Sequence, residues 1–255
     1  MGNHKMIEVL TSIGINIISS LITLLILSAL GWCIFYFTRR SSLLSFFGIK
    51  ETKRIILYLS RIGVSQSIGI DGVPRAFTGS AIAENEALLI PVFQRLFNFI
   101  VPGATNLPGP LKFLLISDVI VAPILSPIKS GGLEKDSTFI AVGSPGYNVA
   151  SLEIENSYHP FAKFVDDNSA FEIKDVPKIT DTRCAFVQKA VNQTTNQHVY
   201  YVAGMSSLGT NGAAFFLANN WHYLNKKYGA NRPFCVVIRV RSDDGYKHEI
   251  LFEKG

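Results

Sequence analysis

Cysteine is scarce in this sequence, with only Cys33, Cys184 and Cys235 among 255 residues. No two of them stand at the C-x-x-C spacing of redox and zinc sites. The shortage excludes a disulfide-stapled secreted scaffold, and we interpret all three as buried free thiols in a reducing compartment. Four histidines lack metal-ligand spacing, so we expect neither a metal nor a cofactor: His159, His198, His222 and His248.

Charge is missing from a long stretch near the N-terminus. From Val9 to Thr38 the chain has no Asp, Glu, Lys or Arg, and the apolar core of this stretch runs from Ile15 to Phe37. At about 1.5 Å per residue, that core is long enough to cross a hydrocarbon layer of roughly 30 Å. A cleaved signal peptide has a shorter apolar region of roughly 7–15 residues, so we expect an uncleaved single-pass anchor.

The charges that flank the apolar stretch are unequal. Its N-terminal side offers Lys5 against Glu8, whereas five basic residues on the other side outnumber Glu51: Arg39, Arg40, Lys50, Lys53 and Arg54. Because positive residues stay cytoplasmic, we expect a protein of the cell (inner) membrane with its N-terminus outside. The predicted parts are a short outer segment (1–12), a membrane helix (13–38), a basic linker (39–53) and a cytoplasmic domain (54–255).

An excess of positive charge is also missing from the predicted cytoplasmic part. Residues 1–54 hold six Lys/Arg and two Asp/Glu, whereas the remaining residues hold 18 and 17. Of the net charge of +5, +4 therefore belongs to the membrane-flanking segment, where it attracts anionic lipid. A nucleic-acid-binding domain needs a basic face of its own, so we expect no nucleic-acid partner.

The pattern after residue 53 predicts an α/β fold: a Rossmann-like, doubly wound and mostly parallel sheet with helices on both faces. Helical spacing favours a helix over 79–100, with Pro91 as a kink or a helix–helix junction, and another over 211–228 that ends at Gly229. Strands are expected at 54–60, 117–127, 138–148, 184–191, 198–204, 233–241 and 248–254. The fourth and fifth of these are spaced as a hairpin, and the last is expected to pair beside the sixth as an edge strand.

Three loops leave the ends of predicted strands, where α/β sheets bind ligands. They are SRIGVSQSIGIDG after Leu59, GSPGYN after Val142 and GMSSLGTNG after Ala203. In the third, Thr210 or Asn211 would cap the next helix, whose first N–H groups form an anion site. Its candidate ligand-binding residues are Gly204, Ser206, Ser207, Gly209, Thr210 and Asn211. The alternative is a plain strand–helix connection, because such junctions are commonly rich in Gly, Ser and Thr.

The second loop adds candidate ligand-binding residues of its own: Gly143, Ser144, Gly146, Tyr147 and Asn148. Tyr147 could stack on a base, or it could cover the core. Asn148 could contact a ribose or base, or it could cap the following helix.

The stretch AGMSSLGTNGAAFFL is similar to the phosphate-binding turn of the Rossmann-like, lysine-decarboxylase-like phosphoribohydrolases. Their superfamily includes nucleotide-sensor domains of bacterial anti-phage signalling, some of them fused to transmembrane segments. In layout the chain also resembles, more distantly, the nucleoside deoxyribosyltransferases. The family turn reads Pro-Gly-Gly-x-Gly-Thr-x-x-Glu. This chain keeps Gly209 and Thr210 but lacks the leading Pro-Gly-Gly spacing, and it has Ala213 where the Glu would stand. The resemblance therefore implies a domain that holds a nucleotide without hydrolysing it.

An enzyme is the alternative hypothesis, because the sequence offers two candidate catalytic carboxylates. Glu84 and Glu86 could serve a nucleoside or nucleotide N-glycosidase, or a deoxyribosyltransferase-like enzyme, as nucleophile or base. They could equally complement a helix dipole. The leading hypothesis is a membrane-anchored nucleotide-binding domain acting as a signalling sensor or effector, and a tethered protein-interaction domain is a third reading. The candidate partners are the lipid bilayer, a nucleotide-like small molecule and a second copy of the chain.

Overall fold

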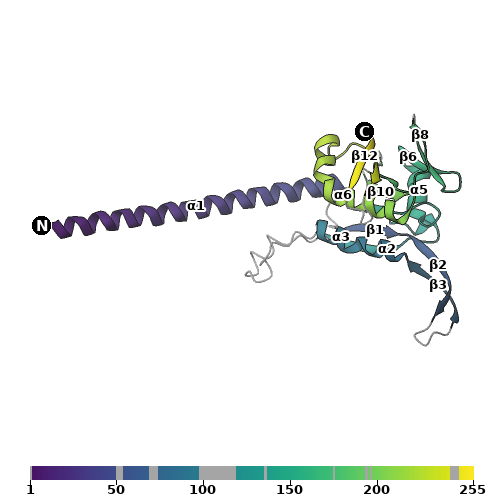
Figure 1. Ribbon diagram of the computed structural model, residues 1–255, viewed down its shortest axis with the longest axis horizontal. Helices are drawn as coiled ribbons and strands as arrows, with labels where there is room; N and C mark the ends of the chain where they lie inside the picture. Colours follow the sequence, from purple (N-terminus) through teal and green to yellow (C-terminus); the bar gives the residue numbers. More distant parts are fainter. Residues whose placement is uncertain are drawn as a thin grey trace. The chain divides into compact units, whose positions relative to one another are not determined.

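The computed structural model describes residues 2–49, 54–68, 74–97, 119–134, 137–174, 176–192, 195, 197–241 and 247–255. Figure 1 shows one long helix and an α/β domain. The chain divides into two compact units, residues 1–43 and 44–255. Each is treated by itself below.

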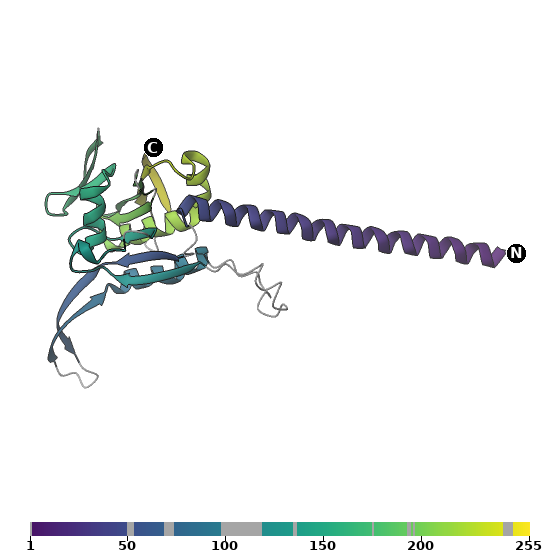
Figure 2. The same ribbon diagram turned by 180° about the vertical axis from the view of Figure 1, so that it is seen from behind.

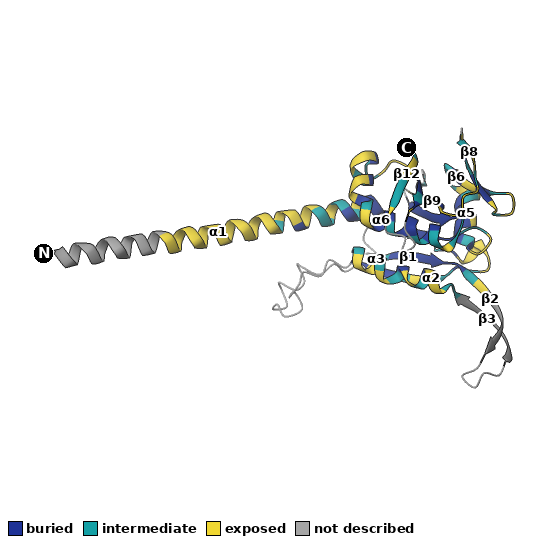
Figure 3. Ribbon diagram, viewed as in Figure 1, coloured by how far each residue is buried: buried dark blue, intermediate teal, exposed yellow. Residues whose placement is uncertain are grey.

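Helix α1 runs without a break from Gly2 to Phe47. The first unit consists of this helix up to residue 43, and the last turn of the helix, from Leu44, belongs to the second unit. Its Ile17–Phe47 part is long and apolar enough to cross a membrane, and a signal sequence would satisfy the same test. Between Ile17 and Phe37 most of its large apolar side chains are exposed, with Leu25 at 67% and Ile34 at 67%. Figure 3 shows this surface in yellow. Exposed apolar area on this scale marks a segment that lipid or another protein covers. The first residues of the predicted linker are helical, because α1 ends only at Phe47.

The second unit is built on a seven-stranded sheet with the order β12-β11-β9-β10-β5-β1-β4. Strands β1, β4, β5 and β10 pair in parallel, whereas β9, β11 and β12 join through antiparallel pairs. The strands are β1 (Arg54–Leu59), β4 (Ile120–Leu125), β5 (Phe139–Val142), β9 (Cys184–Val191), β10 (His198–Gly204), β11 (Phe234–Val240) and β12 (His248–Lys254).

The sheet is mixed, so the prediction of a mostly parallel sheet is wrong for the part formed by β12, β11 and β9. The predicted β9–β10 hairpin is confirmed, and it is the cause: a short connection can join only antiparallel neighbours. A predicted edge pairing is also confirmed, with β12 beside β11.

Helices cover both faces of the sheet, as the sequence predicts. Helix α5 (Val149–Ser157) packs Ala150 and Ile154 into a core with Tyr58, Phe139 and Tyr201 on one face. Helix α6 (Ser207–Tyr228) lies on the other face, where Trp221 and Phe46 are in ring contact and Phe46 also contacts Tyr200. Neighbouring residues Tyr200 and Tyr201 thus point to opposite faces, which is the period-two alternation of a strand.

The order of the parallel strands creates a switch point. From β1 the chain moves to β4 on one side, then crosses to β5 on the other side of β1, and later adds β10 beyond β5. The direction of winding therefore reverses between β1 and β5. In open α/β sheets, the carboxyl ends of the two strands at such a point leave a crevice between their loops.

The chain between β1 and β4 departs from the prediction. The expected loop after Leu59 and the start of the helix expected over 79–100 form a two-stranded sheet, β2 (Arg61–Ile68) with β3 (Pro74–Ile82). Figures 1 and 2 both show this hairpin extending away from the large sheet. Helix begins only at α2 (Glu84–Ala87), followed by α3 (Leu89–Phe97). The predicted junction at Pro91 is confirmed, because Pro91 lies in the first turn of α3, where its missing N–H costs nothing.

A third sheet forms from the stretch predicted to be irregular and aromatic. It contains β6 (Ala162–Val165), β7 (Ala170–Ile173) and β8 (Val176–Ile179). Outside this sheet, a 3₁₀ turn, η2 (Ser130–Gly132), precedes β5. Phe164 and Phe171 pack against Phe186 of the large sheet at ring-centroid distances of 5.8 and 5.0 Å. These contacts fix the β6–β7 turn beside the carboxyl ends of β5 and β10.

Candidate functional site

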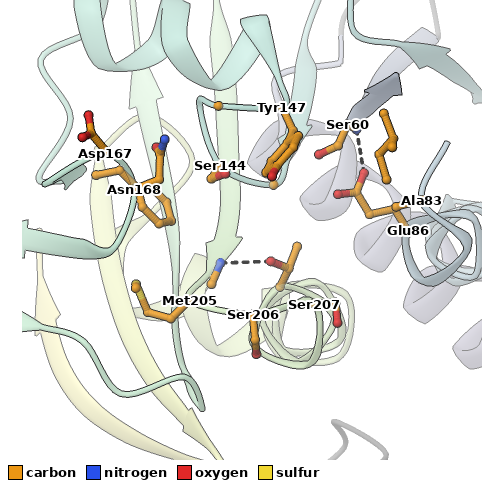
Figure 4. A pocket seen from close by; sticks show the side chains of 16 residues that line it. Ser60, Ala83, Glu86, Ser144, Tyr147, Asp167, Asn168, Met205, Ser206 and Ser207 are labelled. Atoms are coloured by element: carbon orange, nitrogen blue, oxygen red, sulfur yellow. Dashed lines mark hydrogen bonds between the residues drawn. The ribbon is translucent and has the colours of Figure 1, made fainter. Parts of the chain in front are cut away.

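A pocket of about 520 Å³ lies at the carboxyl ends of β1, β5 and β10, beside the switch point. This volume falls within the range of roughly 300–1,000 Å³ typical of small-molecule sites. Figure 4 shows Glu86 and Ser60 on one side, Asp167 and Asn168 on the other, and Ser206 and Ser207 below. The lining residues are Ser60, Ile62, Ala83, Glu86, Gly143, Ser144, Gly146, Tyr147, Phe164, Asp167, Asn168, Gly204, Met205, Ser206, Ser207 and Thr210.

One side of the pocket is built around Glu86 of α2. Its Oε2 accepts a hydrogen bond of 2.6 Å from the backbone N–H of Ser60, directly after β1. The Ser60 hydroxyl donates to the carbonyl of Val142 at the end of β5, at 3.2 Å. Burial raises the pKa of the Glu86 carboxyl, although hydrogen bonds from Ser60 act in the opposite direction. Glu86 thus joins α2 to the two strands at the switch point.

The floor of the pocket is the N-terminus of α6. The cap is Ser206, whose Oγ accepts from Gly209 N at 3.1 Å and donates to Thr182 O at 2.6 Å. The predicted cap at Thr210 or Asn211 is therefore wrong, because the helix starts one turn earlier. The predicted C-terminal stop at Gly229 is confirmed, with φ +76°.

The first turn of α6 leaves donors free for a ligand. The helix's own bonding starts with Thr210 N to Ser206 O. The N–H groups of Ser207 and Leu208 precede that bond and have no partner within the described part of the chain. Such orphan N–H groups, together with the helix dipole, favour an anion. The Ser207 side chain is exposed and adds a hydroxyl.

Close packing explains Gly204. A Cβ at this position would lie 2.5 Å from both Gly209 C and Thr210 N, which are backbone atoms of the first turn of α6. The same contact brings Gly204 N to Thr210 Oγ1, at 3.1 Å. The glycine lets the helix start directly against the end of β10, which sets the position of the free N–H groups.

Four of the five predicted site residues in the β5–α5 loop line the pocket, and the fifth caps α5. Tyr147 is 62% exposed and lines the pocket, as do Gly143, Ser144 and Gly146. Asn148 is fully buried: its Oδ1 accepts from Ala150 N, and its Nδ2 donates to Tyr58 O and Val142 O. It is the N-cap of α5, the alternative that the sequence left open.

The structure brings most of the predicted site residues together. Glu86 and the lining members of the two loops share one pocket, whereas Glu84, Asn148, Gly209 and Asn211 do not line it. Glu84 is exposed. Gly209 packs closely, since a Cβ there would lie 3.0 Å from Cys184 O. For these four residues, contact with a ligand stays a prediction.

Several lining residues were not predicted, and Asp167 and Asn168 are the most polar of them. They belong to the turn DDNS between β6 and β7. Its composition is a turn signal, but nothing local shows that a separate small sheet carries the turn to this pocket. The charged side chains among the described lining residues are both carboxylates, Glu86 and Asp167. Within the described ranges, no group of three or more His, Cys, Asp or Glu could hold a metal ion.

Comparison with known proteins gives no relative: no family model, no curated protein and no solved structure matches this chain.

Proposed function

We propose that this protein is a membrane-anchored α/β domain that binds a nucleotide or nucleotide-derived ligand in the pocket between β1, β5 and β10. The observation that carries the proposal is the coincidence of the pocket with the switch point of the parallel strands. Rossmann-like, doubly wound sheets bind nucleotides at that place, in the crevice outside the carboxyl ends of the strands.

The donors and acceptors of the pocket suit the parts of a nucleotide. The free N–H groups at the start of α6 and the Ser144 and Ser207 hydroxyls suit a phosphate. Exposed Tyr147 offers a ring for stacking on a base. The carboxylates of Glu86 and Asp167 accept hydrogen bonds from sugar hydroxyls or from base N–H groups.

The topology of the second unit suits a sensor or effector. Strand β10 ends at the pocket with Gly204, and near its other end Tyr200 donates to the carbonyl of Phe46, the penultimate residue of α1. Helix α6 likewise begins at the pocket and later contacts Phe46 through Trp221. A ligand that orders the start of α6 therefore acts on two elements that hold the end of α1. We place the protein in the cell (inner) membrane with its N-terminus outside, in signalling of the bacterial anti-phage type.

Ser207→Asp tests the anion site. The new carboxylate replaces an exposed hydroxyl in the first turn of a helix, where negative charge is stabilising, so the fold should be unharmed. Two unit charges about 6 Å apart at an effective dielectric constant of about 20 repel by about 3 kcal/mol, so nucleotide affinity should fall by about 100-fold. Isothermal titration of the full chain in detergent measures this effect.

Ser207→Asn is the matched control, because it has nearly the same shape without the charge. It should change affinity by less than about 5-fold on the usual scale of one neutral hydrogen bond. Equal nucleotide affinity of the wild type and Ser207→Asp would show that the start of α6 does not bind the phosphate. Failure of wild type to bind any nucleotide would leave the tethered interaction domain as the better reading.

A second candidate, a nucleoside or nucleotide N-glycosidase or transferase, is favoured by one observation: Glu86 is buried at 8% exposure, lines the pocket and has a raised pKa. These are properties of a catalytic base or nucleophile. If the protein is such an enzyme, Glu86→Gln should lower base release by at least about 100-fold while ligand still binds. The glutamine keeps an oxygen for Ser60 N, so stability should hold.

Chromatography of released base, with wild type and Glu84→Gln beside Glu86→Gln, separates the two functions. Glu84 is the matched control, since it shares α2 but lies outside the pocket. Release by neither wild type nor Glu84→Gln, with binding intact, supports the sensor. Release that survives in Glu86→Gln would exclude Glu86 as the catalytic group.

A further inference from the structure

The turn between β6 and β7 holds three consecutive residues in the left-handed region. The φ angles are 52° at Asp166, 56° at Asp167 and 68° at Asn168. L-residues avoid this region, and Asp and Asn are the non-glycine residues that tolerate it best. Asp166 pairs with Lys178 of β8, with Nζ 2.8 Å from Oδ2. The side chains of Asp167 and Asn168 line the pocket and have no partner in the described part of the chain.

The β5–α5 loop meets this turn at Gly146. A Cβ on Gly146 would lie 2.9 Å from Nδ2 of Asn168, so the glycine makes room for the carboxamide. The next residue is exposed Tyr147. A carboxylate, a carboxamide and an aromatic ring therefore line one pocket, as Figure 4 shows.

These three groups have complementary capacities. A carboxylate only accepts and can take two N–H groups side by side, whereas a carboxamide both donates and accepts. A tyrosine ring stacks on a planar base. Guanine offers two adjacent N–H donors, N1–H and the 2-amino group, next to the O6 acceptor. Adenine instead presents the unprotonated N1, whose lone pair would face a carboxylate.

We propose that Asp167 and Asn168 recognise a guanine-type base that stacks on Tyr147. Asp167 accepts from the two N–H groups, and Asn168 donates to the carbonyl. The inference rests on the proposed function, because it names the ligand class of the same pocket. It also gives the β6–β7–β8 sheet a role, since that sheet carries the base-reading turn.

Isothermal titration of the full chain in detergent with three monophosphates tests the proposal. Guanosine and inosine monophosphate differ only by the 2-amino group, so wild type should favour the former by about 10-fold or more, the worth of one hydrogen bond to a charged group. Adenosine monophosphate should bind at least about 100-fold more weakly, because it leaves the carboxylate unpaired. Asp167→Asn loses one acceptor, so the preference for guanosine over inosine monophosphate should fall to about 2-fold or less.

Asp166→Asn is the control, because it makes the same change one residue away, outside the pocket, at nearly the same φ. It should keep the wild-type preference. Equal binding of the three nucleotides by wild type, or a preference that survives in Asp167→Asn, would overturn the base assignment and leave the proposed function standing. Binding of none of them, or of other nucleotides alone, would also overturn it. Only failure of every nucleotide tried would remove the proposed function as well.

Discussion

Gly204→Ala is expected to destabilise the domain by about 3 kcal/mol or more, which is enough to unfold a marginal domain. A single methyl group at this position meets two backbone atoms of α6 at 2.5 Å, and no rotamer change can relieve that overlap. The helix start must move away from β10. The bond from Gly204 N to Thr210 Oγ1 then lengthens, and a buried donor loses its partner.

Gly131→Ala serves as the control for the loss of glycine itself. Nothing lies within 4 Å of a Cβ at Gly131, and its φ is not in the left-handed region. Its stability should change by no more than about 0.5 kcal/mol, or rise slightly through the stiffer unfolded chain. Urea unfolding of the full chain in detergent, followed by near-ultraviolet circular dichroism, compares the two. A Gly204→Ala protein as stable as Gly131→Ala would show that α6 does not start against β10.

The second large effect concerns Lys189, a buried amine that has no carboxylate partner among the residues that the structure describes. Its Nζ donates to the carbonyls of Phe46 and Ala230 and lies 5.0 Å from the centre of the Phe46 ring. Burial lowers the pKa of Lys189 to about 7 from its ordinary value near 10.5. Between these two values the unfolded chain binds the proton and the folded chain does not. Stability from this residue should therefore rise as pH increases from about 7 to about 10, by about 4 kcal/mol in total.

The comparison with Lys189→Met isolates this contribution. Burial raises the pKa of Tyr200 and Tyr201, and these phenols act in the opposite sense above about pH 9 in both proteins. The measured quantity is thus the difference in free energy of unfolding between the two proteins at pH 6 and pH 9. We expect the wild type to gain at least about 2 kcal/mol relative to Lys189→Met over this interval. A difference that does not change with pH would mean that the ammonium stays charged in the fold.

Much of the large sheet follows from local sequence, because its strands are short apolar runs bounded by Gly, Pro and Ser. The β9–β10 hairpin and the end of α6 at Gly229 are readable in this way. The β2–β3 hairpin is not, since Gly63 and Gly79 with their serine neighbours have the composition of a loop. Only the pairing of the two strands makes them a sheet.

The candidate site is likewise predictable from local sequence only in part. Loop composition predicts Ser144, Tyr147 and Ser207 as site residues. The loops that contain them follow the neighbouring strands β5 and β10, so these residues lie at the same edge of the sheet. The sequence predicts the start of α6 one turn too late. Ser206, Thr210 and Asn211 are all good N-caps, and only packing against Gly204 decides among them. Asp167 reaches the pocket through a separate sheet held by Phe164 and Phe171, a contact that no sequence period encodes.

A structure of the full-length protein in detergent, determined with saturating guanosine monophosphate, tests the central claim most directly. The account predicts ligand density between the carboxyl ends of β1 and β5, with phosphate oxygens within about 3 Å of the Ser207 and Leu208 N–H groups and the base beside Tyr147. The nucleotide bound elsewhere on the domain, or an empty pocket at a concentration where titration shows saturation, would contradict it.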